Sequence, residues 1–293
     1  MRRSMIALVG CCLAFAGVVA VPAQPAQAVT LLTVTATSSS NSLWVKTADA
    51  RCPANTEVYG GGARIVGGDQ SVTFLRLEPY KAGAVSGYYA VAFETTPLGG
   101  GDYVGSWLLQ VFARCGSGLS GVQHVSQFAT TSDRAPSQYQ ITAQCPDGKV
   151  VIGTGFATSY ISVPVHWIRP INNFTAVQVV IQEDLLNSAF ATDPVTVGAF
   201  AVCASTPAGW WIEVNSTQPL PTNPQILPAS CPAGKQVLGG GLTKYDGSLP
   251  GGYRMTSFVP DPQGAFFAVG GGSLFPHPPL AWALGSFAIC ADI

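Results

Sequence analysis

The chain has 293 residues, a formal net charge of −1 and only 10% charged side chains, against about a quarter in typical soluble domains. Nucleic acids and anionic membranes are bound by clustered Lys and Arg, so this composition excludes a nucleic-acid partner and a charged membrane surface. The polar surface has to come from Ser, Thr, Asn, Gln and Gly.

Residues 1–28 carry the features of an export signal. Two arginines give a positive start, an uncharged apolar run covers residues 5–20, and an Ala-Gln-Ala cleavage pattern follows. The apolar run is short for a membrane span. We therefore expect a secreted, extracellular mature chain that begins near Val29 and has no membrane span, with an uncleaved anchor as the alternative.

The motif Cys-Pro-x₆-Gly-x-Gly occurs three times in the rest of the chain, and each copy is answered further on by Phe-Ala-x-Cys. The repeat predicts three tandem modules, at residues 29–118, 119–207 and 208–293. Each module has a strand-like leader, a turn after Cys-Pro, a β-rich run into the glycines, and further strands, the last of which holds the closing cysteine. No segment has the periodicity of an amphipathic helix.

These patterns predict an all-β chain of three homologous β-sandwich-like modules, with five or six short strands in each. Whether the modules pack together with pseudo-threefold symmetry or stay separate is left open, although the short linkers favour contact. The turn after Cys-Pro has Asn55 in module 1 where the others have Gly148 and Gly234, which indicates a left-handed backbone at this position.

Six cysteines in an exported chain are expected to form disulfides rather than metal or redox sites. The threefold repeat leaves two regular pairings, one within each module and one that joins neighbouring modules in a ring. We favour the pairing within modules because it lets each module be complete, and because a closed loop of this size contributes roughly 4 kcal/mol in the chain-entropy model. The expected pairs are Cys52–Cys115, Cys145–Cys203 and Cys231–Cys290.

The glycines of the motif allow two interpretations. They could form a phosphate-binding loop, or they could mark a bulge or a place where another backbone passes closely. A phosphate loop needs Gly-Lys-Ser/Thr at the start of a helix, and no Lys-Ser/Thr follows these glycines. The structural interpretation is therefore favoured.

The segment Cys-Pro-Ala-Gly-Lys-x-Val-x-Gly-Gly-Gly, followed by a terminal Phe-Ala-x-Cys, resembles a repeat of uncharacterised secreted proteins from actinobacteria. Related segments occur in some phage tail and pilus-tip proteins. The resemblance covers all three modules and implies a bacterial extracellular location and surface binding. It supplies no catalytic residues. Modules 1 and 2 depart from the pattern at Asn55 and Thr154.

Residues that could carry chemistry are few. The three histidines, His124, His166 and His277, fall at different places in their modules and have no metal-binding spacing. There is no Gly-x-Ser-x-Gly, and the acidic residues are scattered. We therefore expect no enzyme, no catalytic residue, no cofactor and no metal site.

The aromatic residues are more informative. Trp107 and Trp282 occupy equivalent positions before the closing cysteine, which predicts core positions packed on the disulfide. Other aromatic residues do not repeat, so a shared module core does not explain them, and they either contact a ligand or fill the contacts between modules. These candidates are Trp167, Trp210, Trp211, Tyr160, Tyr245 and Tyr253.

A repeated disulfide scaffold with few charges and unrepeated aromatic residues favours a secreted, non-enzymatic binding protein for a glycan or another cell-surface polymer. Binding would be multivalent if the sites repeat. The alternative is a structural or protein-partner role, such as a coat component or a protease inhibitor. An extracellular enzyme of unrecognised type would need polar residues of different modules to meet in one cleft.

Overall fold

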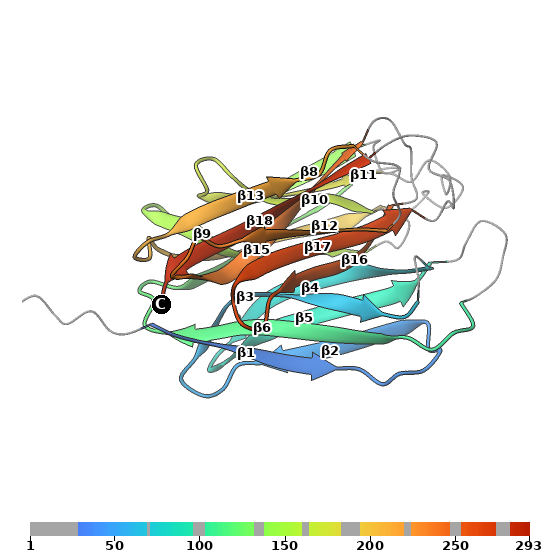
Figure 1. Cartoon of the computed structure of the whole chain (residues 1–293), viewed down its shortest axis with the longest axis horizontal. Coiled ribbons are helices and arrows are strands. Elements are labelled where there is room, and N and C mark those ends of the chain that lie inside the picture. The colour runs from blue at the N-terminus through green and yellow to red at the C-terminus, as the bar shows by residue number, and fades with distance from the viewer. Residues whose placement is uncertain are drawn as a thin grey trace, which may run out of the picture.

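A computed structural model describes residues 29–68, 71–95, 103–131, 138–159, 164–182, 194–219, 224–246, 253–273 and 282–293. The fold is all-β, as predicted, and its strands form three six-stranded sheets. Most strands run along the long axis of the body (Figure 1). Within these ranges no helix is long and apolar enough to cross a membrane.

Each module contributes six strands in the same order. Module 1 has β1 (Thr30–Thr37), β2 (Val45–Arg51), β3 (Glu57–Val66), β4 (Val72–Ala82), β5 (Val85–Glu94) and β6 (Leu108–Ser117). Module 2 has β7 (Gln123–Thr130), β8 (Gln138–Gln144), β9 (Lys149–Thr158), β10 (Val165–Ile171), β11 (Ala176–Gln182) and β12 (Thr196–Ser205). Module 3 has β13 (Trp211–Ser216), β14 (Gln225–Ser230), β15 (Lys235–Asp246), β16 (Tyr253–Pro260), β17 (Phe266–Ser273) and β18 (Trp282–Asp292).

The sheets are shared between modules. The first sheet has the order β1-β6-β3-β16-β17-β14, the second β2-β5-β4-β9-β12-β7, and the third β13-β18-β15-β10-β11-β8. In each sheet, the first, sixth and third strands of one module continue into the fourth, fifth and second strands of another. The junction is always antiparallel pairing between a third strand and a fourth strand: β3 with β16, β9 with β4, and β15 with β10.

Each module is therefore a sandwich of two three-stranded halves that belong to different sheets, and its disulfide joins the two halves. The pairing predicted within modules is confirmed: Cys52–Cys115, Cys145–Cys203 and Cys231–Cys290 have Cα atoms 5.5, 5.8 and 5.8 Å apart. One disulfide connects each pair of sheets, so the three sheets are closed covalently into a ring. Three such bonds indicate an oxidising environment.

The turn after each Cys-Pro has the left-handed backbone that the sequence predicts. The φ angles are 64° at Asn55, 74° at Gly148 and 84° at Gly234. The strands before the Cys-Pro pairs (β2, β8 and β14) were not predicted as separate strands. One of them, β14, contains Pro228, which is tolerated because β14 is an edge strand of the first sheet.

The three modules are related by a pseudo-threefold axis, and the first glycine of each motif lies next to this axis. A β-carbon built on Gly60 would lie 2.8 Å from the Cα of Gly239, one on Gly239 would lie 2.9 Å from Gly153, and one on Gly153 would lie 2.9 Å from Gly60. The three backbones thus contact one another in a closed ring. This confirms the structural interpretation of the motif, in which another backbone passes closely.

The second position of the motif explains why module 2 departs from Gly-Gly-Gly. In modules 1 and 3 the middle glycine lies directly under an aromatic ring of the fifth strand. Module 2 has Thr154 there, and the smaller Val177 occupies the position of the ring. The hydroxyl of Tyr88 donates to the carbonyl oxygen of Thr154 at 3.1 Å, and the Thr154 hydroxyl donates to the carbonyl oxygen of Gly240. These bonds connect all three modules.

Trp107 and Trp282 are core residues, as predicted, with 1% and 2% of their surfaces exposed. The prediction that they pack on the disulfides is wrong for Trp107. Its indole N–H donates to the carboxylate of Glu94 at 2.7 Å, at the end of β5. The disulfide lies at the start of β5, where the backbone N–H of Cys52 donates to Ser86.

Arg114 ties module 1 to module 3. Its guanidinium is buried and donates to the carbonyl oxygen of Val237 at 3.0 Å, to Gln236 Oε1 at 3.2 Å and to Thr33 Oγ1 at 2.7 Å. Burial lowers the pKa of Arg114 to about 10, so the side chain stays charged at neutral pH. The equivalent positions in the other modules carry aliphatic residues, because the register places Val202 and Ile289 there.

We predict that Gly153→Ala destabilises the whole fold by more than about 3 kcal/mol, because the added methyl group would lie 2.1 Å from the Tyr59 carbonyl oxygen. Gly148→Asn serves as the control, since module 1 already has Asn55 at that turn. It should change the free energy of unfolding by less than about 1 kcal/mol. Chemical denaturation measures both, and equal effects would contradict backbone contact at the axis.

We predict that Arg114→Ala lowers the free energy of unfolding by about 2–4 kcal/mol, because it removes a buried stem and leaves polar partners unsatisfied. Arg64→Ala is the matched control: Arg64 is exposed and donates only to Gln110 among its described side-chain partners. Its cost should stay within about 0.5 kcal/mol. Similar denaturation midpoints for the two variants would show that Arg114 does not hold modules 1 and 3 together.

Candidate ligand-binding site

A pocket of about 270 Å³ lies where the third sheet passes from module 3 to module 2. Its lining comes from four strands and combines two aromatic rings, two carboxamides, an imidazole and an ammonium group. The lining residues are Gln138, His166, Trp167, Gln182, Lys244 and Tyr245. Trp167 and Tyr245 are both sequence-predicted candidates, so the fold brings two of the six together.

At the pocket β10 and β15 pair over two residues each, as the strands do at the other two junctions. The paired residues are Trp167 with Thr243 and Ile168 with Leu242. His166 is the additional residue of a bulge in β10, between Val165 and Trp167. A bulge bends its strand and redirects a side chain, and here it places the imidazole at the pocket.

Trp167 is held in one orientation. Its indole N–H donates to the carbonyl oxygen of Lys244 at 3.0 Å, and the guanidinium of Arg169 lies 4.1 Å from the ring centre. Tyr245 is on the neighbouring strand and has 48% of its surface exposed. The pocket thus has a fixed aromatic wall beside a tyrosine ring that a ligand can reach.

Two nitrogen-containing side chains of the pocket lining, Lys244 and His166, are buried. The Lys244 ammonium lies 4.9 Å from the ring centre of Tyr253, and the His166 ring lies 6.4 Å from the same ring. Burial, and secondarily the charge of Lys244, hold the pKa of His166 well below its ordinary value of 6.5. At neutral pH His166 is therefore an uncharged hydrogen-bonding group.

The remaining aromatic candidates lie elsewhere. Tyr253 is 2% exposed and packs edge-on against Trp282. Trp210 packs near the end of the axis, where it donates to the Val151 carbonyl oxygen at 3.3 Å. Trp211 is exposed on the edge strand β13, and Tyr160 lies outside the described residues.

The pocket breaks the pseudo-threefold symmetry. At the two equivalent sheet junctions, the register places Arg76 and Ser257 where the third sheet has Trp167. Among the described residues, this pair of aromatic walls therefore occurs at one junction of three. The expectation of repeated sites has no support from this pocket.

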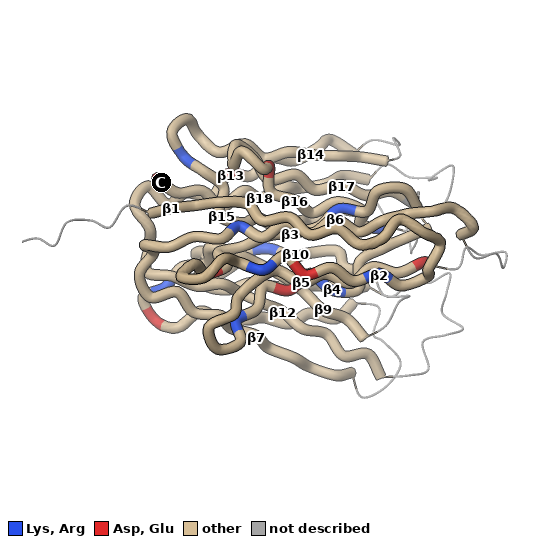
Figure 2. The backbone as a smooth tube through the Cα atoms, turned by 90° about the horizontal axis from the view of Figure 1, so that it is seen from below, with Lys and Arg blue, Asp and Glu red and all other residues tan. Residues whose placement is uncertain are grey.

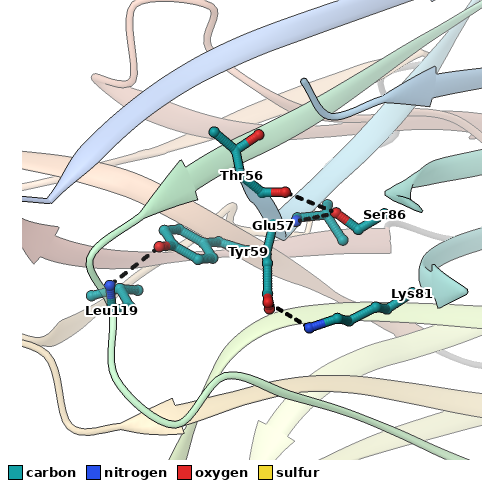
Figure 3. Close-up of polar contacts among 7 residues, drawn as sticks. Thr56, Glu57, Tyr59, Lys81, Ser86 and Leu119 are labelled. Atoms are coloured by element: carbon teal, nitrogen blue, oxygen red, sulfur yellow. Dashed lines mark hydrogen bonds and ion pairs between the residues drawn. The ribbon is translucent and has the colours of Figure 1, made fainter. Parts of the chain in front are cut away.

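A second hollow, of about 330 Å³, lies at the link between modules 1 and 2 and includes Asn55, Glu57, Tyr59 and residues 116–119. Figure 3 shows its polar contacts. The Glu57 carboxylate pairs with Lys81 at 2.5 Å, and the Tyr59 hydroxyl accepts the Leu119 N–H at 3.2 Å. Burial raises the pKa of Tyr59, so it stays protonated at neutral pH.

His124 lies beside this hollow, between modules 1 and 2. Both of its ring nitrogens and the Oε2 atom of Glu57 are buried, and no hydrogen bond of normal geometry reaches them from the described residues; the Pro79 carbonyl oxygen makes only a weak, poorly aligned contact with the ring. Burial lowers the pKa of His124 to about 4, while Glu57 and the backbone carbonyl of Pro79 act in the opposite direction. The imidazole is therefore neutral at physiological pH.

Charged side chains are dispersed over the described chain, with basic and acidic residues interleaved (Figure 2). Within the described ranges no three His, Cys, Asp or Glu residues group closely enough to hold a metal ion. No protein-family model matches the sequence, and no curated protein matches it either.

Sequence reasoning missed the carboxamides of the pocket. Gln138 and Gln182 are direct Cα partners across β8 and β11. A signal was present, because the segment from Gln138 to Gln144 alternates glutamine or threonine with apolar residues. Such period-two alternation places the polar side chains on one face of a strand.

The depressed pKa of His124 predicts a loss of stability in acid. Its folded pKa of about 4 lies below the unfolded value of 6.5, so as the pH falls below 6.5 the unfolded chain takes up the proton first. Stability is retained above pH 6.5 and is lost progressively towards pH 4. His166 contributes in the same direction.

Between pH 4 and pH 6.5, the free energy of unfolding should change less steeply with pH in His124→Ile than in the native chain. We predict that the slope falls by ~1.4 kcal/mol per pH unit, which corresponds to the uptake of one proton. Module 3 has Ile212 at the equivalent position, so the substitution uses a residue that the fold already accepts. Denaturation at a series of pH values measures the slope, with Gln127→Ile on the same strand as control. An unchanged slope in His124→Ile would show that this histidine titrates normally.

Proposed function

We propose that this protein is a secreted, non-enzymatic binding protein that recognises a glycan through the pocket formed by Trp167 and Tyr245. The observation that carries the proposal is the composition of this pocket: two aromatic rings from neighbouring strands beside two paired carboxamides. Sugar rings present apolar C–H faces that stack on aromatic side chains, and hydroxyl groups that exchange hydrogen bonds with amides.

The geometry favours recognition of a single sugar ring in the pocket. Its volume of about 270 Å³ is near the lower limit of small-molecule sites. The bond from Trp167 to the Lys244 carbonyl fixes one wall before a ligand arrives, which reduces the entropy lost on binding. Binding rather than hydrolysis is supported because glycosidases need two facing carboxylates, and none is among the described lining residues.

The export features of the chain also support a glycan-binding role. The N-terminal signal features and the three disulfides both suit an extracellular protein, where polymers of cell surfaces are the available glycans. The resemblance to secreted actinobacterial repeat proteins points in the same direction.

A protein-partner role, as in a coat component or a protease inhibitor, is the second candidate. The observation that favours it is the adjacent pair Leu43 and Trp44, which are 62% and 64% exposed just before β2. Exposed apolar side chains that lie together commonly mark a protein contact. Co-purification with and without Trp44→Ala distinguishes this role from glycan binding.

The test of the main proposal is calorimetric titration of the mature chain with neutral oligosaccharides and with solubilised cell-wall polymers. We predict saturable binding that Trp167→Ala and Tyr245→Ala each weaken at least tenfold, about 1.4 kcal/mol. Trp211→Ala is the control, because Trp211 is 52% exposed on β13 and is not a lining residue. Absence of binding by the native chain, or equal loss in the control, would overturn the proposal.

A further inference from the structure

We infer that the ligand is a linear, uncharged polysaccharide that lies along β8 and β11, with one of its sugar rings in the pocket between Trp167 and Tyr245. This inference rests on the proposed function and extends it, because it assigns a binding face beyond the pocket. It follows from a row of glutamine side chains that continues from the pocket over the outer face of the third sheet.

The row is built by strand alternation. Along β8 the side chains of Gln138, Gln140 and Gln144 are exposed, while Ile141 and Ala143 between them are buried. The neighbouring strand adds Gln182 opposite Gln138. Residues directly opposite in an antiparallel pair share one face, so Gln138 lies beside Gln182, and Thr142 beside Gln178, while the buried Val180 lies opposite Gln140.

The surface is preorganised by a chain of hydrogen bonds. The guanidinium of Arg169 donates to Gln178 Oε1 at 3.1 and 3.2 Å, and Gln178 Nε2 donates to Gln140 Oε1 at 3.2 Å. The same guanidinium lies over the ring of Trp167. One cation therefore fixes both the pocket wall and the glutamine row. The amide N–H groups of Gln140 remain at the exposed end of the chain, where they can donate to sugar oxygens.

The length of the row exceeds one sugar ring. Gln144 lies six positions after Gln138, which corresponds to about 20 Å at the rise of a β-strand. The row is also open at the side, because β8 is an edge strand of the third sheet. Among the described strands, none therefore obstructs a chain of several sugar rings along the open side of β8.

The other two modules do not have glutamine at the positions that correspond to this row. By the register, Thr47 and Ile226 lie on β2 and β14 where β8 has Gln140, and Asp49 and Pro228 lie where β8 has Thr142. Glutamine thus gathers on one of three equivalent edge strands, the same one that borders the pocket. The described outward-facing residues of β8 and β11 include no charged side chain of either sign, and the neighbouring Arg169 guanidinium is already bonded to Gln178, which suits an uncharged ligand.

The inference is tested by titrating the mature chain with neutral oligosaccharides of one to six sugar residues, from several linkage types, and with oligomers of uronic acids. For a linkage type that binds, affinity should rise at least tenfold from the shortest to the longest oligomer. Gln140→Ala should remove most of this gain and leave binding of the monosaccharide unchanged. Uronic-acid oligomers of equal length should bind more weakly.

Gln127→Ala is the matched control, since Gln127 is an exposed glutamine on the edge strand β7 of the second sheet. It should keep the full dependence on length. Affinity that is independent of length, or an equal loss for short and long oligomers in Gln140→Ala, would overturn the extended face and leave the pocket as the binding site. If no oligomer binds the native chain, the proposed function fails together with this inference.

Discussion

The contact of three glycine backbones at the pseudo-threefold axis is the constraint on which the rest of this structure depends. With hydrogen atoms in place of side chains, Gly60, Gly153 and Gly239 bring the third strands of all three modules within contact distance. At this separation each third strand also pairs with the fourth strand of another module. The sheets therefore pass from one module to the next, and the disulfides join sheets that are already shared.

The sequence identified the parts that depend on local chemistry. The disulfide pairs follow from the threefold repeat, and the left-handed turn at Asn55 and the close approach at the glycines follow from residue types with narrow conformational preferences. The sharing of sheets could not be derived, because strand periodicity is the same whether β4 pairs within its own module or with β9. The position of Trp107 was misplaced for a related reason: equivalence in the repeat indicates burial, but it does not indicate what the side chain contacts.

The same limit applies to the candidate site. Trp167 and Tyr245 were found because they break the repeat, but they lie in different modules, and only the junction between β10 and β15 brings them together. The glutamines of β8 do not stand out in the sequence of a chain whose polar surface is mostly uncharged. They become meaningful once the register sets Gln138 beside Gln182 and connects Arg169 to Gln140 through Gln178. The residues that repeat in all three modules thus form the scaffold, and the residues that do not repeat form the proposed binding site.

The central claim is that three covalently stapled modules form one cooperative unit because no sheet belongs to a single module. Differential scanning calorimetry of the mature, oxidised chain tests this most directly. If the chain is one cooperative unit, it unfolds in one transition. The ratio of calorimetric to van't Hoff enthalpy is then about one. A ratio of about three, or separate transitions for separate modules, would contradict it.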